Sequence, residues 1–195
     1  MFSSPRLAFL LSCAAALLLA GCAQAPSQRL VDTAAAVQAV RVYVWSPGDG
    51  AFTGASRDAL LATLSRNGLT VSGLVVLDRP LPDLGALASL WASIPFSTPA
   101  SHALVLTAQG QATQGQFQYQ RFEAVAWEAA TQRLVWKSTL ASMTQPAFAS
   151  RSERLAADLL RGLAREGLLP PASGAPRDAQ GQDIPPTRLP IQLQP

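Results

Sequence analysis

The chain has 195 residues, with 15 Lys and Arg against 12 Asp and Glu and a formal net charge of +3. A balance this close to neutral, without a basic stripe or an aromatic-interleaved basic patch, argues against nucleic-acid binding. The length allows one domain with a sizeable core plus flanking tails.

The beginning of the chain has the three zones of a secretory signal peptide. Arg6 supplies a positive charge, an apolar run covers 7–19, and small residues lead to Cys22. The run is too short to span a bilayer comfortably. The Leu-Ala-Gly-Cys sequence at 19–22 resembles the lipobox of bacterial lipoproteins, in which the cysteine receives lipid and the chain is cleaved before it. The sequence therefore predicts a signal peptide over 1–21 and a palmitate-bearing lipid anchor on Cys22.

Two further predictions follow from this anchor. Several acyl chains on one residue bury enough methylene groups for stable membrane attachment. Ala23 stands where an aspartate favours retention in the inner membrane, so the resemblance implies the periplasmic face of the outer membrane. Cys13 leaves with the signal peptide and Cys22 is lipidated, which excludes a disulfide and a thiolate metal site in the mature domain.

Hydrophobic periodicity and turn residues predict the elements of one α+β domain over 37–169. In chain order they are a strand at 40–45, a helix at 57–67, a strand at 69–77, a helix at 83–93, strands at 103–107, 118–128 and 134–140, and a helix that begins at Ser150 and stops at Gly167. This β-α-β-α-β-β-β-α order predicts a mixed, mostly antiparallel sheet with helices on one face. Gln and Gly residues at 109–116 predict a solvated hairpin tip.

Both flanks of this domain are predicted to lie outside the fold. Residues 22–36 begin with a polar, small-residue stretch and are interpreted as a lipidated tether. Residues 170–195 are rich in Pro, Gly and Gln without periodicity, which predicts a disordered tail.

The residues that could act in catalysis or bind a metal do not form a recognisable active-site or metal-binding motif in the sequence. His102 is the only histidine and is predicted to be a structural or surface residue in a loop before a strand. Glu123 and Glu128 have opposite parity on one predicted strand, so they should face opposite sides of the sheet and cannot form a glycosidase pair. The Gly-Asp-Gly run at 48–50 is a turn rather than a phosphate-binding loop. We therefore expect no enzyme activity, no cofactor and no metal.

Aromatic residues gather on the three-stranded meander. Trp127 and Trp136 flank a short turn and are predicted to pair across the hairpin. Core packing is one interpretation of the cluster. The other is a partner-binding surface made of Phe117, Tyr119, Trp127 and Trp136.

The stretch 122–138 reads FEAVAWEAATQRLVWKS and resembles a hairpin that recurs in small envelope lipoproteins. The resemblance rests on Trp127, Glu128, Thr131, Val135 and Trp136, and the family usually has Asp at the position of Glu128. A helix ending in Gly-Leu-Leu-Pro at 167–170 follows, as is common in the family. The set is similar to lipoproteins of the curli-secretion and penicillin-binding-protein-activator type, with an anticodon-binding-like α+β domain. The resemblance rests on structural motifs, so it assigns no functional residue and implies a non-enzymatic, partner-binding lipoprotein.

Two functions remain open at this point. The leading hypothesis is a membrane-anchored periplasmic lipoprotein that binds a protein partner in envelope assembly or maintenance. The alternative is a carrier of a lipid or glycan between membranes, which requires a sizeable apolar pocket between the sheet and the helices.

Overall fold

The computed structural model describes residues 27–32, 34–47, 52, 54–96, 98–114, 117–143, 150–170 and 174–187. The predicted signal peptide and Cys22 lie outside these residues. In chain order the elements are β1 (Ser27–Arg29), β2 (Ala39–Trp45), α2 (Ala55–Arg66), β3 (Thr70–Val76), α3 (Leu84–Ser93), β4 (His102–Gln114), β5 (Phe117–Glu128), β6 (Arg133–Met143) and α4 (Ser150–Arg165). The predicted α+β class is confirmed.

The strands form one six-stranded sheet in the order β1-β6-β5-β4-β2-β3. β4, β5 and β6 make the predicted antiparallel meander, and β1 pairs antiparallel with β6. β2 pairs parallel with both β3 and β4. Each parallel neighbour is reached through a helix, as parallel pairing requires. The sheet is therefore mixed and mostly antiparallel, as predicted.

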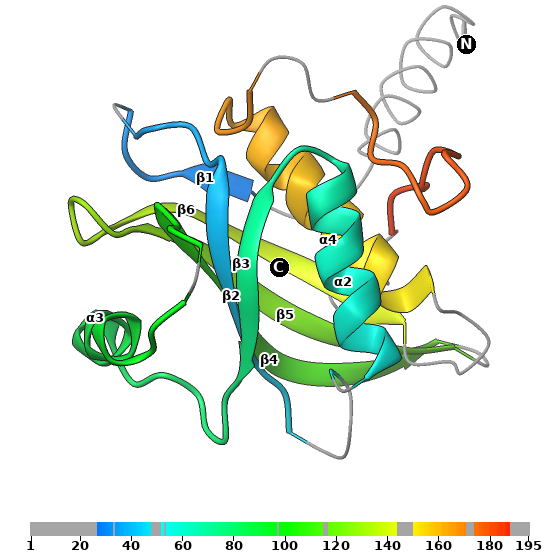
Figure 1. Ribbon diagram of the computed structural model, residues 1–195. Coiled ribbons are helices and arrows are strands. Elements are labelled where there is room, and N and C mark those ends of the chain that lie inside the picture. Colours follow the sequence, from blue (N-terminus) through cyan, green and yellow to red (C-terminus); the bar gives the residue numbers. More distant parts are fainter. Residues whose placement is uncertain are drawn as a thin grey trace, which may run out of the picture.

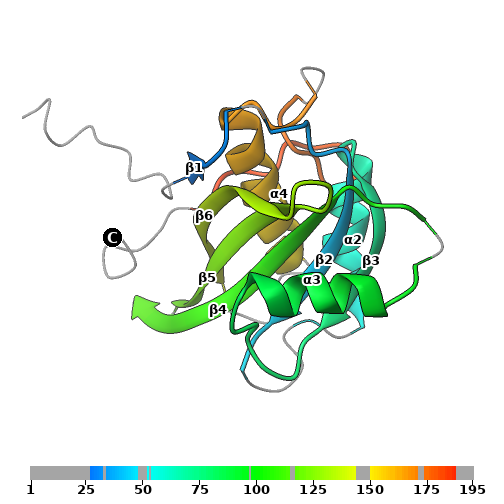
Figure 2. The ribbon, with the colours of Figure 1, turned by 90° about the vertical axis from the view of Figure 1, so that its left-hand side faces the viewer.

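The helices cover both faces of this sheet. α2 and α4 lie side by side on one face (Figure 1), where they pack on the larger hydrophobic core. α3 lies on the opposite face (Figure 2), which departs from the expectation that all helices share one face. The cause is a second core on that face, made by Tyr43, Ala103, Val105 and Trp127 with Leu87 of α3. Strands that are apolar on both sides need cover on both sides.

Arg41 of β2 attaches the C-terminal end of α3 to the sheet. Its guanidinium carbon lies 4.0 Å from the ring centroid of Trp91 and 4.5 Å from that of Phe96. It also donates hydrogen bonds to the carbonyl oxygens of Trp91 at 2.8 Å and Ile94 at 3.3 Å. Gly73 makes room for this cluster, because a Cβ there would lie 2.7 Å from Phe96 Cε1. A cation between two aromatic rings thus attaches a helix that carries no charged residue.

The predicted pairing of Trp127 with Trp136 is wrong. In the β5–β6 register Ala126 faces Trp136, and Trp127, the next residue, faces Leu134 after a one-residue shift. Because neighbouring residues of a strand point to opposite faces, Trp127 lies in the core beneath α3 and Trp136 in the core beneath α4. Which residues face each other is set by the register, and the sequence of the hairpin alone does not reveal it.

The hairpin between β4 and β5 is longer than predicted. Residues 109–114, which we interpreted as part of a solvated loop, continue β4 and pair with β5 as far as Gln114 and Phe117. Their Gln and Gly composition is typical of a loop, but residues 110–114 pair with β5, after a register shift that leaves Gln109 without a partner on that strand. Tertiary pairing therefore overrides local composition here.

Both flanking segments also contribute to the fold. Part of the predicted tether, Ser27–Arg29, is the edge strand β1. Within the segment predicted to be a disordered tail, residues 174–187 contact α4, and Pro176 and Ile184 are buried there. In both cases the segment gains its order from distant parts of the chain, so its local sequence carries little signal.

Candidate functional site

Residues 174–187, which we call the strap, contact α4 and the residue that follows α2, and they turn back at 178–182 so that Arg177 pairs with Asp183. One end is held by Asn67, the residue that follows α2. Its Oδ1 accepts a hydrogen bond from the Arg177 backbone N at 2.8 Å, and its Nδ2 donates to the Arg177 carbonyl oxygen at 3.1 Å. A side-chain amide that binds both backbone groups of one residue recognises extended chain without regard to its side chain.

The other end of the strap is held by an ion pair on α4. Arg161 Nη1 lies 2.8 Å from Asp158 Oδ1, and Arg161 Nη2 donates to the Ile184 carbonyl oxygen. The Thr187 backbone N donates to both carboxylate oxygens of Asp158, at 3.3 and 3.1 Å. These contacts are again made to backbone atoms. Asn67, Asp158 and Arg161 therefore each bind main-chain atoms of the strap, each at a different residue.

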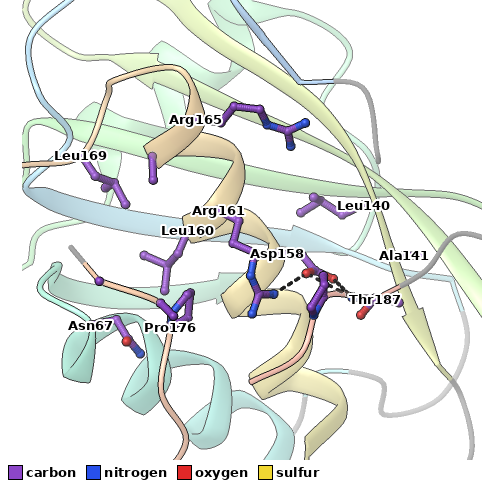
Figure 3. A pocket seen from close by; sticks show the side chains of 14 residues that line it. Asn67, Leu140, Ala141, Asp158, Leu160, Arg161, Arg165, Leu169, Pro176 and Thr187 are labelled. Carbon is purple, nitrogen blue, oxygen red and sulfur yellow. Dashed lines mark hydrogen bonds and ion pairs between the residues drawn. The ribbon is translucent and has the colours of Figure 1, made fainter. Parts of the chain in front are cut away.

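A cavity of about 650 Å³ opens where the strap meets α4 and the end of β6 (Figure 3). Its lining is mostly apolar, with Asp158 and Arg161 at one side. The lining residues are Asn67, Leu140, Ala141, Asp158, Leu160, Arg161, Ala164, Arg165, Leu169, Gly174, Ala175, Pro176, Pro186 and Thr187. The volume lies in the range of about 300–1,000 Å³ that is typical of sites for small molecules or for several side chains of a bound peptide.

Burial controls the electrostatics of this cavity. Desolvation raises the pKa of Asp158, while the hydrogen bonds from Thr187 and the charge of Arg161 act in the opposite direction. The Asp158 carboxylate is already bound by Thr187 and Arg161. Apolar walls with one fixed pair of charges are suited to binding and orienting a ligand.

The structure does not assemble the predicted aromatic surface. Trp127 and Trp136 are core residues, 1% and 0% exposed, so they are not available to a partner. Tyr119 is half-buried on β5, and Phe117 begins β5 with a side chain outside the described part of the structure. The core-packing interpretation therefore holds for the two tryptophans. Cys22, the predicted lipidation site, precedes the first described residue.

His102 lies in a different place from the one predicted. It is the first residue of β4 rather than a loop residue, and its side chain is fully buried. Nδ1 is 2.9 Å from Ser101 Oγ, and Nε2 has no hydrogen-bond partner in the described structure. Burial lowers the pKa of this imidazole, against the charge of Glu128. The neutral ring is a structural part of the sheet.

The two glutamates are separated as predicted. Glu123 forms an ion pair with Lys137 at 2.9 Å, whereas Glu128 accepts a hydrogen bond from Thr131 Oγ1 at 2.7 Å in the β5–β6 turn. Their different partners give no shared cleft.

Over the described ranges, no group of three or more His, Cys, Asp or Glu residues is placed to hold a metal ion. The helices described here include none that is long and apolar enough to cross a membrane.

No protein-family model matches the sequence, and no curated protein matches it. Among solved structures, the chain is similar to the PelC dodecamer from Paraburkholderia phytofirmans, at 13% identity and a TM-score of 0.44, covering 71% of this chain and 95% of that one. It is also similar to lipoprotein GNA1162 from Neisseria meningitidis, at 11% identity and a TM-score of 0.36, covering 66% and 99%. The hypothetical protein CT253 from Chlamydia trachomatis gives 11% identity, a TM-score of 0.36, and coverage of 67% and 97%. These similar structures thus include a protein named as a lipoprotein.

Proposed function

We propose that this chain is a lipid-anchored envelope lipoprotein, on the periplasmic face of the outer membrane, that binds a protein partner and catalyses no reaction on it. The membrane attachment is supported by the Leu-Ala-Gly-Cys sequence at 19–22 and the signal-peptide zones before it. Partner binding is supported by one observation above all: Asn67, Asp158 and Arg161 hold the strap, on either side of its turn, through its main-chain atoms.

Main-chain recognition is the step that connects this geometry to a partner. Hydrogen bonds to backbone groups supply affinity for any extended segment, and neighbouring pockets for side chains supply the choice among segments. The strap satisfies the first requirement in its own chain, and the cavity beside it satisfies the second. We infer that a segment of an envelope protein with apolar side chains takes the place that the strap occupies in this structure.

Metabolic labelling with palmitate tests the anchor. Cys22→Ala is expected to abolish the label and leave the precursor uncleaved at that site. Cys13→Ala is the matched control, because that cysteine lies in the segment removed on cleavage, and it should keep the label. Unchanged labelling of the Cys22 variant would show that the anchor is not on this residue.

Site-specific photo-crosslinking in living cells tests the partner. A photoreactive residue at Ala164, an exposed position in the cavity lining, is expected to give a discrete adduct with an envelope protein. The same residue at Ser89, an exposed position on α3, is the control. The adduct should weaken in an Asn67→Ala, Asp158→Ala double variant. Identical adducts from both positions, or none from Ala164, would contradict the proposed site.

The volume of the cavity favours a second candidate, a carrier for a lipid or glycan. In that case the protein extracted from membranes should retain a small molecule detectable by native mass spectrometry. Ala164→Phe, which places a ring in the cavity lining, should weaken its retention. Extraction of the unoccupied protein under conditions that preserve weak complexes would reject the carrier hypothesis.

A further inference from the structure

The distance along the chain between the proposed anchor and the fold is very short. β1 begins at Ser27, five residues after Cys22. Five residues span at most about 18 Å when fully extended, and about 12 Å as a flexible chain. The headgroup layer takes up about 5–8 Å of this length. The edge strand is therefore held within about 10–13 Å of the headgroups.

The domain is wider than this tether is long. A compact domain of this size has a radius of gyration of about 15 Å. A body of that size on so short a tether cannot turn its opposite side toward the membrane. The side that carries β1 must face the lipid.

Rigid attachment of β1 transfers this constraint to the whole domain. Trp136 Nε1 donates to Ser27 Oγ at 2.9 Å, and Ser27 Oγ donates to the Gly162 carbonyl oxygen at 3.3 Å. Arg29 donates from its guanidinium to the carbonyl oxygens of Val31 and Glu166, at 2.9 and 3.2 Å. The edge strand is thus joined to β6 and to the end of α4, so it cannot serve as part of a loose linker.

Leu30 is the exposed large hydrophobic residue that lies next to β1. Three large hydrophobic side chains of the described residues are exposed: Leu30 at 38%, Val76 at 50% and Leu84 at 40%. Leu30 directly follows β1, and its backbone N donates to the Val135 carbonyl oxygen at 2.9 Å. Val76 ends β3, which lies five strand spacings, or about 24 Å, from β1. Leu84 begins α3, which packs on β2, β4 and β5.

We propose that the domain rests against the lipid surface through its β1 edge, with Leu30 at the contact. This rests on the proposed lipid anchor at Cys22. The occupant of the surface is the headgroup region of the bilayer that holds the anchor. Because the tether rather than surface charge enforces the contact, it should persist at high salt.

The chain is well suited to a probe experiment, because Cys13 and Cys22 are its only cysteines. Leu30→Cys, Val76→Cys and Leu84→Cys each introduce one labelling position into the mature lipoprotein. Each variant is labelled with a fluorophore and reconstituted in phosphatidylethanolamine–phosphatidylglycerol vesicles that carry a headgroup-attached quencher. We expect loss of fluorescence at position 30 and little loss at positions 76 and 84. Equal quenching at the three positions, or none at position 30, overturns the inference.

A length variant separates the tether from any intrinsic affinity for lipid. Thirty Gly and Ser residues inserted before Ser27 extend the reach to about 30 Å. Quenching at position 30 should then fall to the level of positions 76 and 84, and its persistence would overturn the tether mechanism. Palmitate labelling of the same samples distinguishes the two proposals. If the protein carries palmitate but is quenched equally at the three positions, the orientation alone is refuted. If the protein carries no palmitate, both the anchor and the orientation are refuted.

Discussion

Gly162 lies where α4 makes its closest approach to the sheet, and Gly162→Ala tests how tightly the two are packed. A Cβ at this position would lie 2.6 Å from Trp136 Cζ2, well inside van der Waals contact. The indole cannot easily move away, because Trp136 is fully buried and its Nε1 is hydrogen-bonded to Ser27. Overpacking of a core costs about 1–3 kcal/mol. Alanine recovers up to about 1 kcal/mol of helix propensity.

The net expectation is a loss of roughly 1–2 kcal/mol in the free energy of unfolding. For a domain of this size each kcal/mol corresponds to about 2–4 °C, so thermal denaturation followed by circular dichroism should show a Tm lower by several degrees. Hydrogen exchange at the Leu30 amide should also accelerate, because displacement of Trp136 weakens the attachment of β1. Gly110→Ala is the control, since a Cβ there meets no atom within 4 Å. An unchanged or higher Tm for Gly162→Ala would show that α4 does not pack on Trp136 as closely as described.

Three further substitutions test separate contacts. Because burial raises the pKa of Asp158, the free energy of unfolding should fall as pH rises from 3.8 to the pKa in the folded state. Asp158→Asn should remove this fall when the free energy of unfolding is measured by urea denaturation at several pH values. If the pH dependence is the same in the variant, Asp158 is not its source. Because burial lowers the pKa of His102, the free energy of unfolding should fall as pH falls from 6.5 toward the pKa in the folded state. His102→Gln should remove this acid sensitivity. If the variant keeps the same acid sensitivity, another group is responsible for it. Arg41→Met removes the cation between Trp91 and Phe96 and should cost about 1–2 kcal/mol. Hydrogen exchange should then accelerate in α3, and unchanged exchange would contradict the role of Arg41.

Elements with a strong local signal were predictable from the sequence. Alternating valines predicted β2, and the predicted helix at 83–93 is matched by α3, whose N-cap Asp83 accepts a hydrogen bond from the Ala86 backbone N at 2.8 Å. The meander and the mixed sheet followed from the order of such elements. The edge strand β1 was missed, because three polar residues carry no periodicity and form a strand only through β6.

The candidate site was much harder to predict, and the reason is physical. Asp158 and Arg161 lie on α4, for which the sequence predicted a helix and no binding site. The ion pair itself is local, three residues apart, but its importance comes from the strap, and the strap looked disordered because it is rich in proline. Asn67 was noticed only as the end of a helix. Its two hydrogen bonds reach Arg177, 110 residues away, and a pattern within one segment holds no trace of such a partner.

The pairing of β1 with β6 has a consequence for the order in which the chain folds. The Trp136 indole that holds Ser27 follows it by 109 residues, and Glu166, which binds the Arg29 backbone N, follows by 137. During synthesis β1 can therefore pair only after β6 and α4 have been made, and pairing between such distant segments is intrinsically slow. Closure of the sheet edge at β1 is therefore a late event in the folding of this domain.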